Sequence, residues 1–148
     1  MRIAIASDHG GFSLKTAVIK AISGEFSVED LGPATDAPCD YPDSAIPVAK
    51  AVASGKADFG ILVCRSGIGM SMTANRFQNV RATICDTVDQ AAVTRRHNDA
   101  NVLCLGAMIW GDWMACEAVD VFLNTNLGDG LEDLKEFLQE AAKTVAKI

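Results

Sequence analysis

The chain has 148 residues, of which 49% are hydrophobic and 22% are charged, and its formal net charge is −6. This length suits one domain with a substantial core, so we expect a single domain over residues 1–148. The acidic balance argues against nucleic acid as the main partner, because phosphate backbones demand a basic surface, although a local positive pocket could still hold a small anion.

Strand-like and helix-like segments alternate along the chain. In chain order we predict a strand at 2–7, a helix at 11–22, a strand at 26–32, a helix at 44–54, a strand at 58–64, a helix at 68–77, a strand at 80–85, a helix at 87–98, a strand at 101–106 and a helix at 112–124. The inner strands are apolar on both faces, which indicates a parallel sheet covered on both sides. We therefore predict an α/β fold, a Rossmann-like three-layer α/β/α sandwich with a five-stranded parallel sheet.

A further helix is expected at the C-terminus, at about 129–147. Its apolar positions form one stripe: Leu131, Leu134, Leu138, Ala141 and Val145. Spacing alone leaves two alternatives open, a helix folded back on its own domain and a helix that crosses to a partner subunit. Its position beyond the last strand favours the second, and with it a homodimer or a dimer of dimers.

Cysteine usage and the absence of targeting patterns indicate the compartment. The five cysteines are odd in number and include no CxxC pair: Cys39, Cys64, Cys85, Cys104 and Cys116. Such spacing is typical of buried thiols in a reducing cytoplasm. No apolar run could cross a bilayer, and the start lacks a secretory signal pattern, so we expect a cytoplasmic protein without a membrane partner. The two histidines match no zinc motif, and we expect no metal and no cofactor.

In open parallel sheets, ligands bind beyond the carboxyl ends of the strands. The segment with Asp8 and His9 follows the first strand, and the loop with Tyr41 follows the second. A histidine flanked by glycines at this edge favours a functional role over a structural one. His97 and Asn98 end the fourth helix and would reach this edge only if that helix bent toward it. His97 is open to two interpretations, a cation at the helix C-terminus or an acid/base group that titrates near neutrality.

The third strand is followed by CRSGIGMS, residues 64–71. Gly67 and Gly69 let backbone amides approach a ligand closely, and a helix that starts here directs free N–H groups at the same place. Such a place stabilises an oxyanion and favours a cysteine thiolate, which together suffice to remove a proton from carbon next to a carbonyl. The alternative is a structural turn with a buried thiol. No dinucleotide or P-loop motif occurs.

Several motifs together carry a family resemblance. SDHGG at 7–11, DYP at 40–42, ILVC-x-SGIGMSMTANR at 61–76, VRA at 80–82 and RRHNDANVLCLG at 95–106 resemble, in order and spacing, the ribose-5-phosphate isomerase B family. That family includes the galactose-6-phosphate isomerase subunits. The resemblance implies a metal-free aldose–ketose isomerase of carbohydrate metabolism, in the pentose phosphate pathway. It acts through an enediol(ate), with active sites at a dimer interface.

The resemblance also implies roles for individual residues. Cys64 is similar to the catalytic cysteine that moves the proton, Ser66 to the hydroxyl residue that assists at the substrate oxygens, and His97 to the residue that opens the sugar ring. The backbone of the anion hole corresponds to Gly67, Ile68, Gly69, Met70 and Ser71. The positions near the sugar correspond to Asp8, Tyr41 and Asn98, and His9 corresponds to a contact with the phosphate.

The chain departs from the family pattern at positions that carry charge. Arg65 stands where the family usually has glycine, and Met108 stands where it usually has arginine. An approximate alignment places Leu131 and Lys135 at two further arginine positions, which leaves Lys135 as a candidate phosphate ligand. Lysine does not reproduce the two-oxygen fork of arginine. Two explanations stay open: Arg65 and Arg96 supply the charge from another direction, or the substrate is a different sugar.

The sequence therefore predicts an isomerase that interconverts a sugar phosphate such as ribose 5-phosphate with ribulose 5-phosphate. The alternatives are the same chemistry on a different phosphorylated or non-phosphorylated sugar, and a non-catalytic module that binds a sugar or nucleotide. Arg65 counts among the expected substrate-binding residues because it adjoins Cys64.

Overall fold

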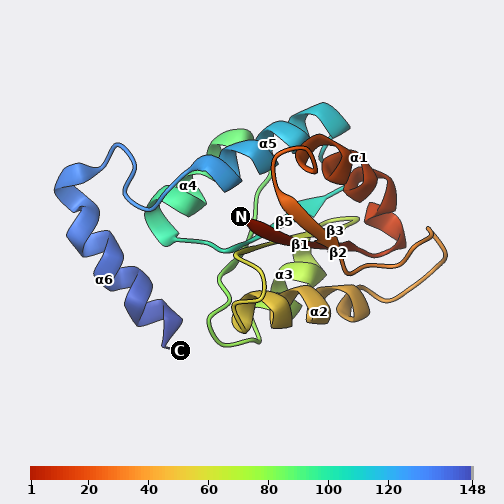
Figure 1. Cartoon of the computed structure of the whole chain (residues 1–148), viewed down its shortest axis with the longest axis horizontal. Helices are drawn as coiled ribbons and strands as arrows, with labels where there is room; N and C mark the ends of the chain where they lie inside the picture. Colours follow the sequence, from red (N-terminus) through yellow and green to blue (C-terminus); the bar gives the residue numbers. More distant parts are fainter. Residues whose placement is uncertain (148) are drawn as a thin grey trace.

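A computed structural model describes residues 1–147 (Figure 1). The strands are β1 (Arg2–Ser7), β2 (Ser27–Asp30), β3 (Phe59–Cys64), β4 (Ala82–Ile84) and β5 (Val102–Gly106). The helices are η1 (His9–Gly11), α1 (Phe12–Ile22), α2 (Tyr41–Ala53), α3 (Ile68–Ala74), α4 (Val88–Asn98), α5 (Asp112–Asn124), η2 (Glu132–Leu134) and α6 (Lys135–Ala146), of which η1 and η2 are 3₁₀ turns. The predicted α/β fold is confirmed.

All five strands are parallel and lie in the order β2-β1-β3-β5-β4. The chain leaves β1 toward β2 on one side and continues to β3 on the other, so the direction of winding reverses between β1 and β3. The registers Ser7↔Val63 and Cys64↔Gly106 bring the ends of β1, β3 and β5 to one edge. We call it the carboxyl edge. Ligands of open parallel sheets bind beside such a reversal.

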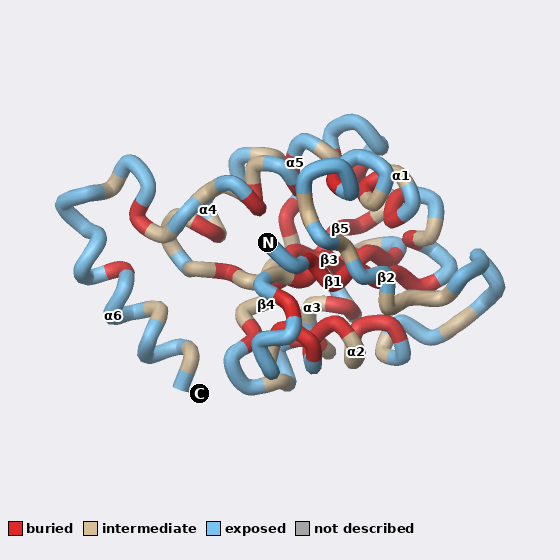
Figure 2. Tube along the Cα trace, viewed as in Figure 1, coloured by how far each residue is buried: buried red, intermediate tan, exposed pale blue. Residues whose placement is uncertain are grey.

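Helices cover both faces of the sheet, with α1, α4 and α5 on one side and α2 and α3 on the other (Figure 1). The burial pattern follows the strand period of two. Ile61 and Val63 pack under α1 and α5, whereas Leu62 and Cys64 face α2 and α3. Figure 2 shows the buried positions gathered in the strands and on the inner helix faces. Cys64 therefore belongs to the α2–α3 side of the sheet.

Two boundaries differ from the sequence predictions. Helix α2 begins at Tyr41, three residues before the predicted start, because Pro42 occupies the first turn, where a missing N–H costs no hydrogen bond. Strand β4 spans only Ala82–Ile84, since the Arg81 amide donates instead to the Asn101 side chain. The early start of α2 places Tyr41 on a helix.

The C-terminal helix begins at Lys135, after the η2 turn, and stands at one side of the molecule (Figures 1 and 2). It contacts α4, and Leu138 is its buried residue. Phe137 and Val145 of the same helix, and Leu134 at the end of η2, are about half exposed or more. Within residues 1–147, every helix is too short or too polar to cross a membrane.

Candidate active site

Cys64 ends β3 with a buried thiol at the carboxyl edge. Gly67 turns the chain with φ of 78°, in the left-handed region, and its N–H donates to the Cys64 Sγ at 3.0 Å. The turn also packs closely, because a Cβ at Gly67 would lie 3.3 Å from the Leu105 carbonyl carbon. Glycine thus allows both the turn and the contact. An N–H donor at this distance stabilises negative charge on the sulfur.

Backbone amides beyond this turn differ in what they bind. The Ile68 N–H lies 3.4 Å from the Ser66 Oγ, and the Ser71 N–H donates to the Gly67 carbonyl at 3.1 Å. Among the described residues, none accepts a hydrogen bond from the amides of Gly69 or Met70. These two orphan donors of the first helical turn can receive an oxyanion.

The structure shows which backbone amides of the expected anion hole over 67–71 are already engaged. The Ser71 amide is committed to the helix, because it already donates to Gly67. The Met70 side chain is fully buried in the core, so only its backbone can face a ligand. Within the described residues, the amides of Gly69 and Met70 are the ones that stay free to receive an anion.

The loop after β1 lies against the same edge. The Asp8 amide donates to the Val63 carbonyl at 3.2 Å, and the Asp8 carboxylate accepts from the Gly11 N–H at 3.1 Å. Gly11 packs on Val63 so closely that a Cβ there would lie 2.6 Å from its backbone. His9 is exposed, and its Nδ1 contacts the Cys39 backbone at 3.0 Å. The structure thus brings Asp8 and His9 beside the end of β3.

Tyr41 packs on Gly69 of α3, and Arg65 directly follows Cys64. A Cβ at Gly69 would lie 2.7 Å from the Tyr41 ring, so the ring rests against the backbone of α3. A Cβ at Gly10 would lie 3.3 Å from the Arg65 Cβ, so the base of Arg65 packs on the loop after β1. Arg65 is exposed and takes part in none of the ion pairs among residues 1–147.

A cavity of about 390 Å³ opens at the ends of β3, β4 and β5. It is lined by Ser66, Ile68, Ile84, Asp86, Gln90, Met108 and Ile109. Four of these escaped the sequence prediction: Ile84, Asp86, Gln90 and Ile109. Their signal was positional, because Ile84 ends β4, Asp86 and Ile109 come shortly after β4 and β5, and Gln90 lies in the first turn of α4. Met108 is exposed and places an apolar side chain where the family resemblance implies a cation.

The structure does not bring His97, Asn98 or Lys135 to Cys64 within one chain. Helix α4 starts beyond the end of β4 and runs back to the beginning of β5. Cys64 pairs with Gly106 at the other end of β5, so the two ends are separated by the length of that strand, about 13 Å at a rise of about 3.3 Å per residue. His97 and Asn98 instead border a cavity of about 330 Å³ between β4, α4 and α6. Lys135 begins α6, where its side chain packs on Gly128. No bend of α4 toward the carboxyl edge occurs.

Three of the other thiols, Cys85, Cys104 and Cys116, are poor nucleophiles because burial disfavours their charged form. Burial raises the pKa of the Cys104 thiol strongly, and it also raises the pKa of the Cys85 and Cys116 thiols. None of the three lies in the turn after β3. Within residues 1–147, no group of three or more histidine, cysteine, aspartate or glutamate side chains is arranged to hold a metal ion.

The Cys64 thiol accepts a hydrogen bond from a backbone amide where the winding of the sheet reverses, and two free amides lie beside it. This arrangement suits an enzyme that moves a proton to and from a carbon atom. The comparisons with known proteins give the same class. Residues 3–144 match the model of the Ribose/Galactose Isomerase family. The chain belongs to this family of sugar-phosphate isomerases and is an isomerase, which sets aside the non-catalytic module.

Three relatives are informative. Ribose-5-phosphate isomerase B of Escherichia coli is 38% identical, with 87% of each chain covered. A crystal structure of ribose-5-phosphate isomerase B from Mycoplasma genitalium with bound ribulose-5-phosphate has a TM-score of 0.88 and 37% identity, covering 99% of this chain and 94% of the other. The 4-deoxy-4-sulfo-D-erythrose isomerase of Clostridium sp. (strain MSTE9) is 34% identical, covering 100% of this chain and 95% of the relative.

Proposed function

We propose that this isomerase interconverts an aldose phosphate and a ketose phosphate, with ribose 5-phosphate and ribulose 5-phosphate as the first candidate pair. The observation that carries the proposal is the Gly67 N–H bond to the Cys64 Sγ beside the free amides of Gly69 and Met70. The M. genitalium relative, which holds ribulose-5-phosphate in its crystal structure, supports this choice of sugar.

The chemistry requires one base that reaches two adjacent carbons. The Cys64 thiolate takes the proton from C2 of the open-chain aldose, the C–H electrons form the C1–C2 double bond, and the carbonyl electrons move to O1. The amides of Gly69 and Met70 stabilise the resulting enediolate oxygen. Ser66 moves the proton between O2 and O1, and Cys64 returns its proton to C1 to give the ketose.

We further propose that two copies of the chain form the complete site, with His97 and Asn98 supplied by the partner copy. His97 lies at the opposite end of the sheet from Cys64, and its ring makes no hydrogen bond with a described residue. Ring opening needs an acid/base group that titrates near neutrality, as histidine does. The exposed apolar positions of α6, Phe137 among them, supply a surface for this dimer contact.

A second candidate substrate is a sugar with a singly charged terminal group. The full-length match to a 4-deoxy-4-sulfo-D-erythrose isomerase favours it, because a sulfonate carries one negative charge where a phosphate carries up to two. Arg65 is the uncommitted arginine beside Cys64, since Lys15 at the same edge is paired with Asp30. One guanidinium fits one singly charged group, and Met108 adds none.

The deciding experiment is a substrate panel on the purified full-length protein. Ribose 5-phosphate, 4-deoxy-4-sulfo-D-erythrose and free D-ribose are each assayed for ketose formation. Highest kcat/KM on ribose 5-phosphate supports the first candidate, and highest kcat/KM on the sulfonated sugar supports the second. Turnover of free D-ribose alone would overturn both, because each requires an anionic end group.

Arg65→Ala tests whether Arg65 binds the anionic end of the substrate, with Lys20→Ala as the control. Lys20 is an exposed cation at the last turn of α1, remote from the carboxyl edge. Loss of a charge-assisted hydrogen bond predicts a rise of about ten- to a hundredfold in KM for the anionic substrate. Unchanged KM in Arg65→Ala would remove Arg65 from the binding site.

A further inference from the structure

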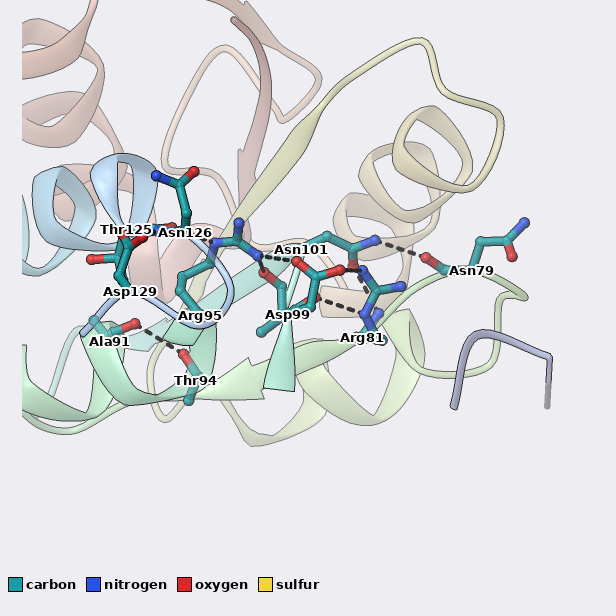
Figure 3. Close-up of polar contacts among 11 residues, drawn as sticks. Asn79, Arg81, Ala91, Thr94, Arg95, Asp99, Asn101, Thr125, Asn126 and Asp129 are labelled. Carbon is teal, nitrogen blue, oxygen red and sulfur yellow. Dashed lines mark hydrogen bonds and ion pairs between the residues drawn. The ribbon is translucent and has the colours of Figure 1, made fainter. Parts of the chain in front are cut away.

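An ion-pair network surrounds the end of α4, directly after His97 and Asn98. Asp99 caps the helix in the left-handed conformation, with φ of 50°. Its carboxylate contacts the Arg95 Nη1 at 2.7 Å and the Arg81 Nη2 at 2.8 Å. Figure 3 shows this carboxylate between the two guanidinium groups.

Both arginines fasten the network to other elements. The Arg81 Nε donates to the Asp99 carbonyl at 2.7 Å, which joins the residues before β4 to the end of α4. The buried Arg95 donates to the Ala100 carbonyl at 2.8 Å and to the Thr125 carbonyl at 3.2 Å, beyond the end of α5. Asp99 and Arg95 together thereby join three segments: the residues before β4, the end of α4 and the end of α5.

The Arg95 guanidinium is also held by two aromatic rings. It lies 4.6 Å from the centroid of the Phe59 ring and 5.7 Å from that of Phe122. A planar cation stacked in this way has little freedom to turn. Because Arg95 is fixed by the core, its bond to Asp99 fixes the end of α4 as well.

His97 lacks anchors of its own. Its ring makes no hydrogen bond with any residue in the described part of the chain, and it borders the cavity between β4, α4 and α6. The position of the ring therefore depends on the backbone of the last helical turn. That backbone is set two residues further on, at Asp99.

We infer that Asp99 is a positioning residue, which holds His97 and Asn98 in the geometry that the isomerisation requires. The inference rests on the proposed function in giving His97 a part in the reaction. Misplacement of an acid/base group by about 1 Å can cost a hundredfold in rate, so the rigidity of this turn has a direct consequence for turnover.

The test begins with Asp99→Asn, which keeps the side-chain shape and the preference for the left-handed conformation while it removes the charge. Asp58→Asn is the control, because Asp58 pairs with Arg2 at 2.6 Å and lies outside the His97 cavity. The chain has two histidines, so NMR ring-proton signals separate His97 from His9. We expect Asp99→Asn to shift or broaden the His97 signals alone, and Asp58→Asn to change neither. Unchanged His97 signals in Asp99→Asn would overturn the inference.

A double-mutant cycle then distinguishes positioning from simple destabilisation. Asp99→Asn should lower kcat for the sugar phosphate that the wild type turns over by about ten- to a hundredfold. In a His97→Ala background the same change should cost less than about twofold, because the group it positions is gone. Equal losses in both backgrounds would make Asp99 merely structural.

Two outcomes separate this inference from the proposed function. A wild type that turns over no sugar refutes the proposed function, whereas the His97 signals still report whether Asp99 positions the ring. If Asp99→Asn fails to fold, Arg81→Gln replaces it, because it removes one of the two guanidinium partners and spares the buried Arg95. The same shift of the His97 signals is then expected, and its absence refutes positioning.

Discussion

Cys64 and His97 lie at opposite ends of the same parallel sheet. Cys64 ends β3 and pairs with Gly106 at the end of β5, whereas His97 precedes the start of β5. Both residues match positions that the family resemblance implies to act on one sugar. A single copy of the chain therefore separates the two groups that the proposed reaction uses together, which is why we propose a site completed by a second copy.

Mixing two strongly impaired variants tests this arrangement. Cys64→Ala and His97→Ala are each expected to keep only a small residual activity on cyclic sugar phosphates. After the two proteins are unfolded and refolded together, heterodimers contain one intact site, and activity should return to about a quarter of the wild type by random association. Failure to recover activity, despite heterodimers detected by native mass spectrometry, would place the complete site within one chain.

Mutation and alkylation of the cysteines should show that activity depends on Cys64 and on no other thiol. We expect Cys64→Ala to lower kcat by at least about a hundredfold, because it removes the base, and to leave the unfolding midpoint close to that of the wild type. Iodoacetamide should inactivate the wild type at a rate slowed by substrate. Burial raises the pKa of the Cys85, Cys104 and Cys116 thiols, so mass spectrometry of the native protein should find them unmodified. The partly exposed Cys39 is removed by Cys39→Ala, which should keep full activity.

Acid pH should reveal the ion pair of Asp58. The hydrogen bonds from Arg2 lower the pKa of this carboxyl to about 2, below its usual value of 3.8. Since the pKa is lower in the folded state, the stabilisation is fully present above the unfolded value and is lost as the pH falls through about 2. The wild type should therefore exceed Asp58→Asn in melting temperature by a constant margin between about pH 5 and 8, and the margin should close toward pH 2. A difference in melting temperature that persists at pH 2, or that does not shrink when salt is added, would contradict this assignment.

Much of the fold and part of the site follow from local sequence pattern. Apolar runs such as 58–64 mark buried parallel strands, and the sheet rule then places Cys64 at the ligand edge. The same rule places the last turn of α4 away from this edge unless the helix bends, and periodicity alone could not exclude such a bend. The pairing of Arg81 with Asp99 is equally hidden, since 18 residues separate them and only the packed sheet brings them together.

The contact between Gly69 and Tyr41 gives a last test, because it concerns the shape of the site rather than its charge. A Cβ at Gly69 would lie 2.7 Å from the Tyr41 ring, which is 43% exposed and so has room to swing outward. Gly69→Ala should thus displace the ring and raise KM by about tenfold. The free energy of unfolding should change by less than about 1 kcal/mol, because the higher helix propensity of alanine, about 1 kcal/mol over glycine, offsets the cost of moving the ring.

A second double-mutant cycle, of Gly69→Ala with Tyr41→Ala, identifies the cause of the rise in KM. In a Tyr41→Ala background the ring is absent, so Gly69→Ala should leave KM unaltered and raise the free energy of unfolding by about 0.5–1 kcal/mol through helix propensity alone. Gly24→Ala is the matched control, since a Cβ there meets nothing within 4 Å. If Gly69→Ala raised KM equally in both backgrounds, the added methyl group would obstruct the sugar directly, and Tyr41 would have no part in the effect.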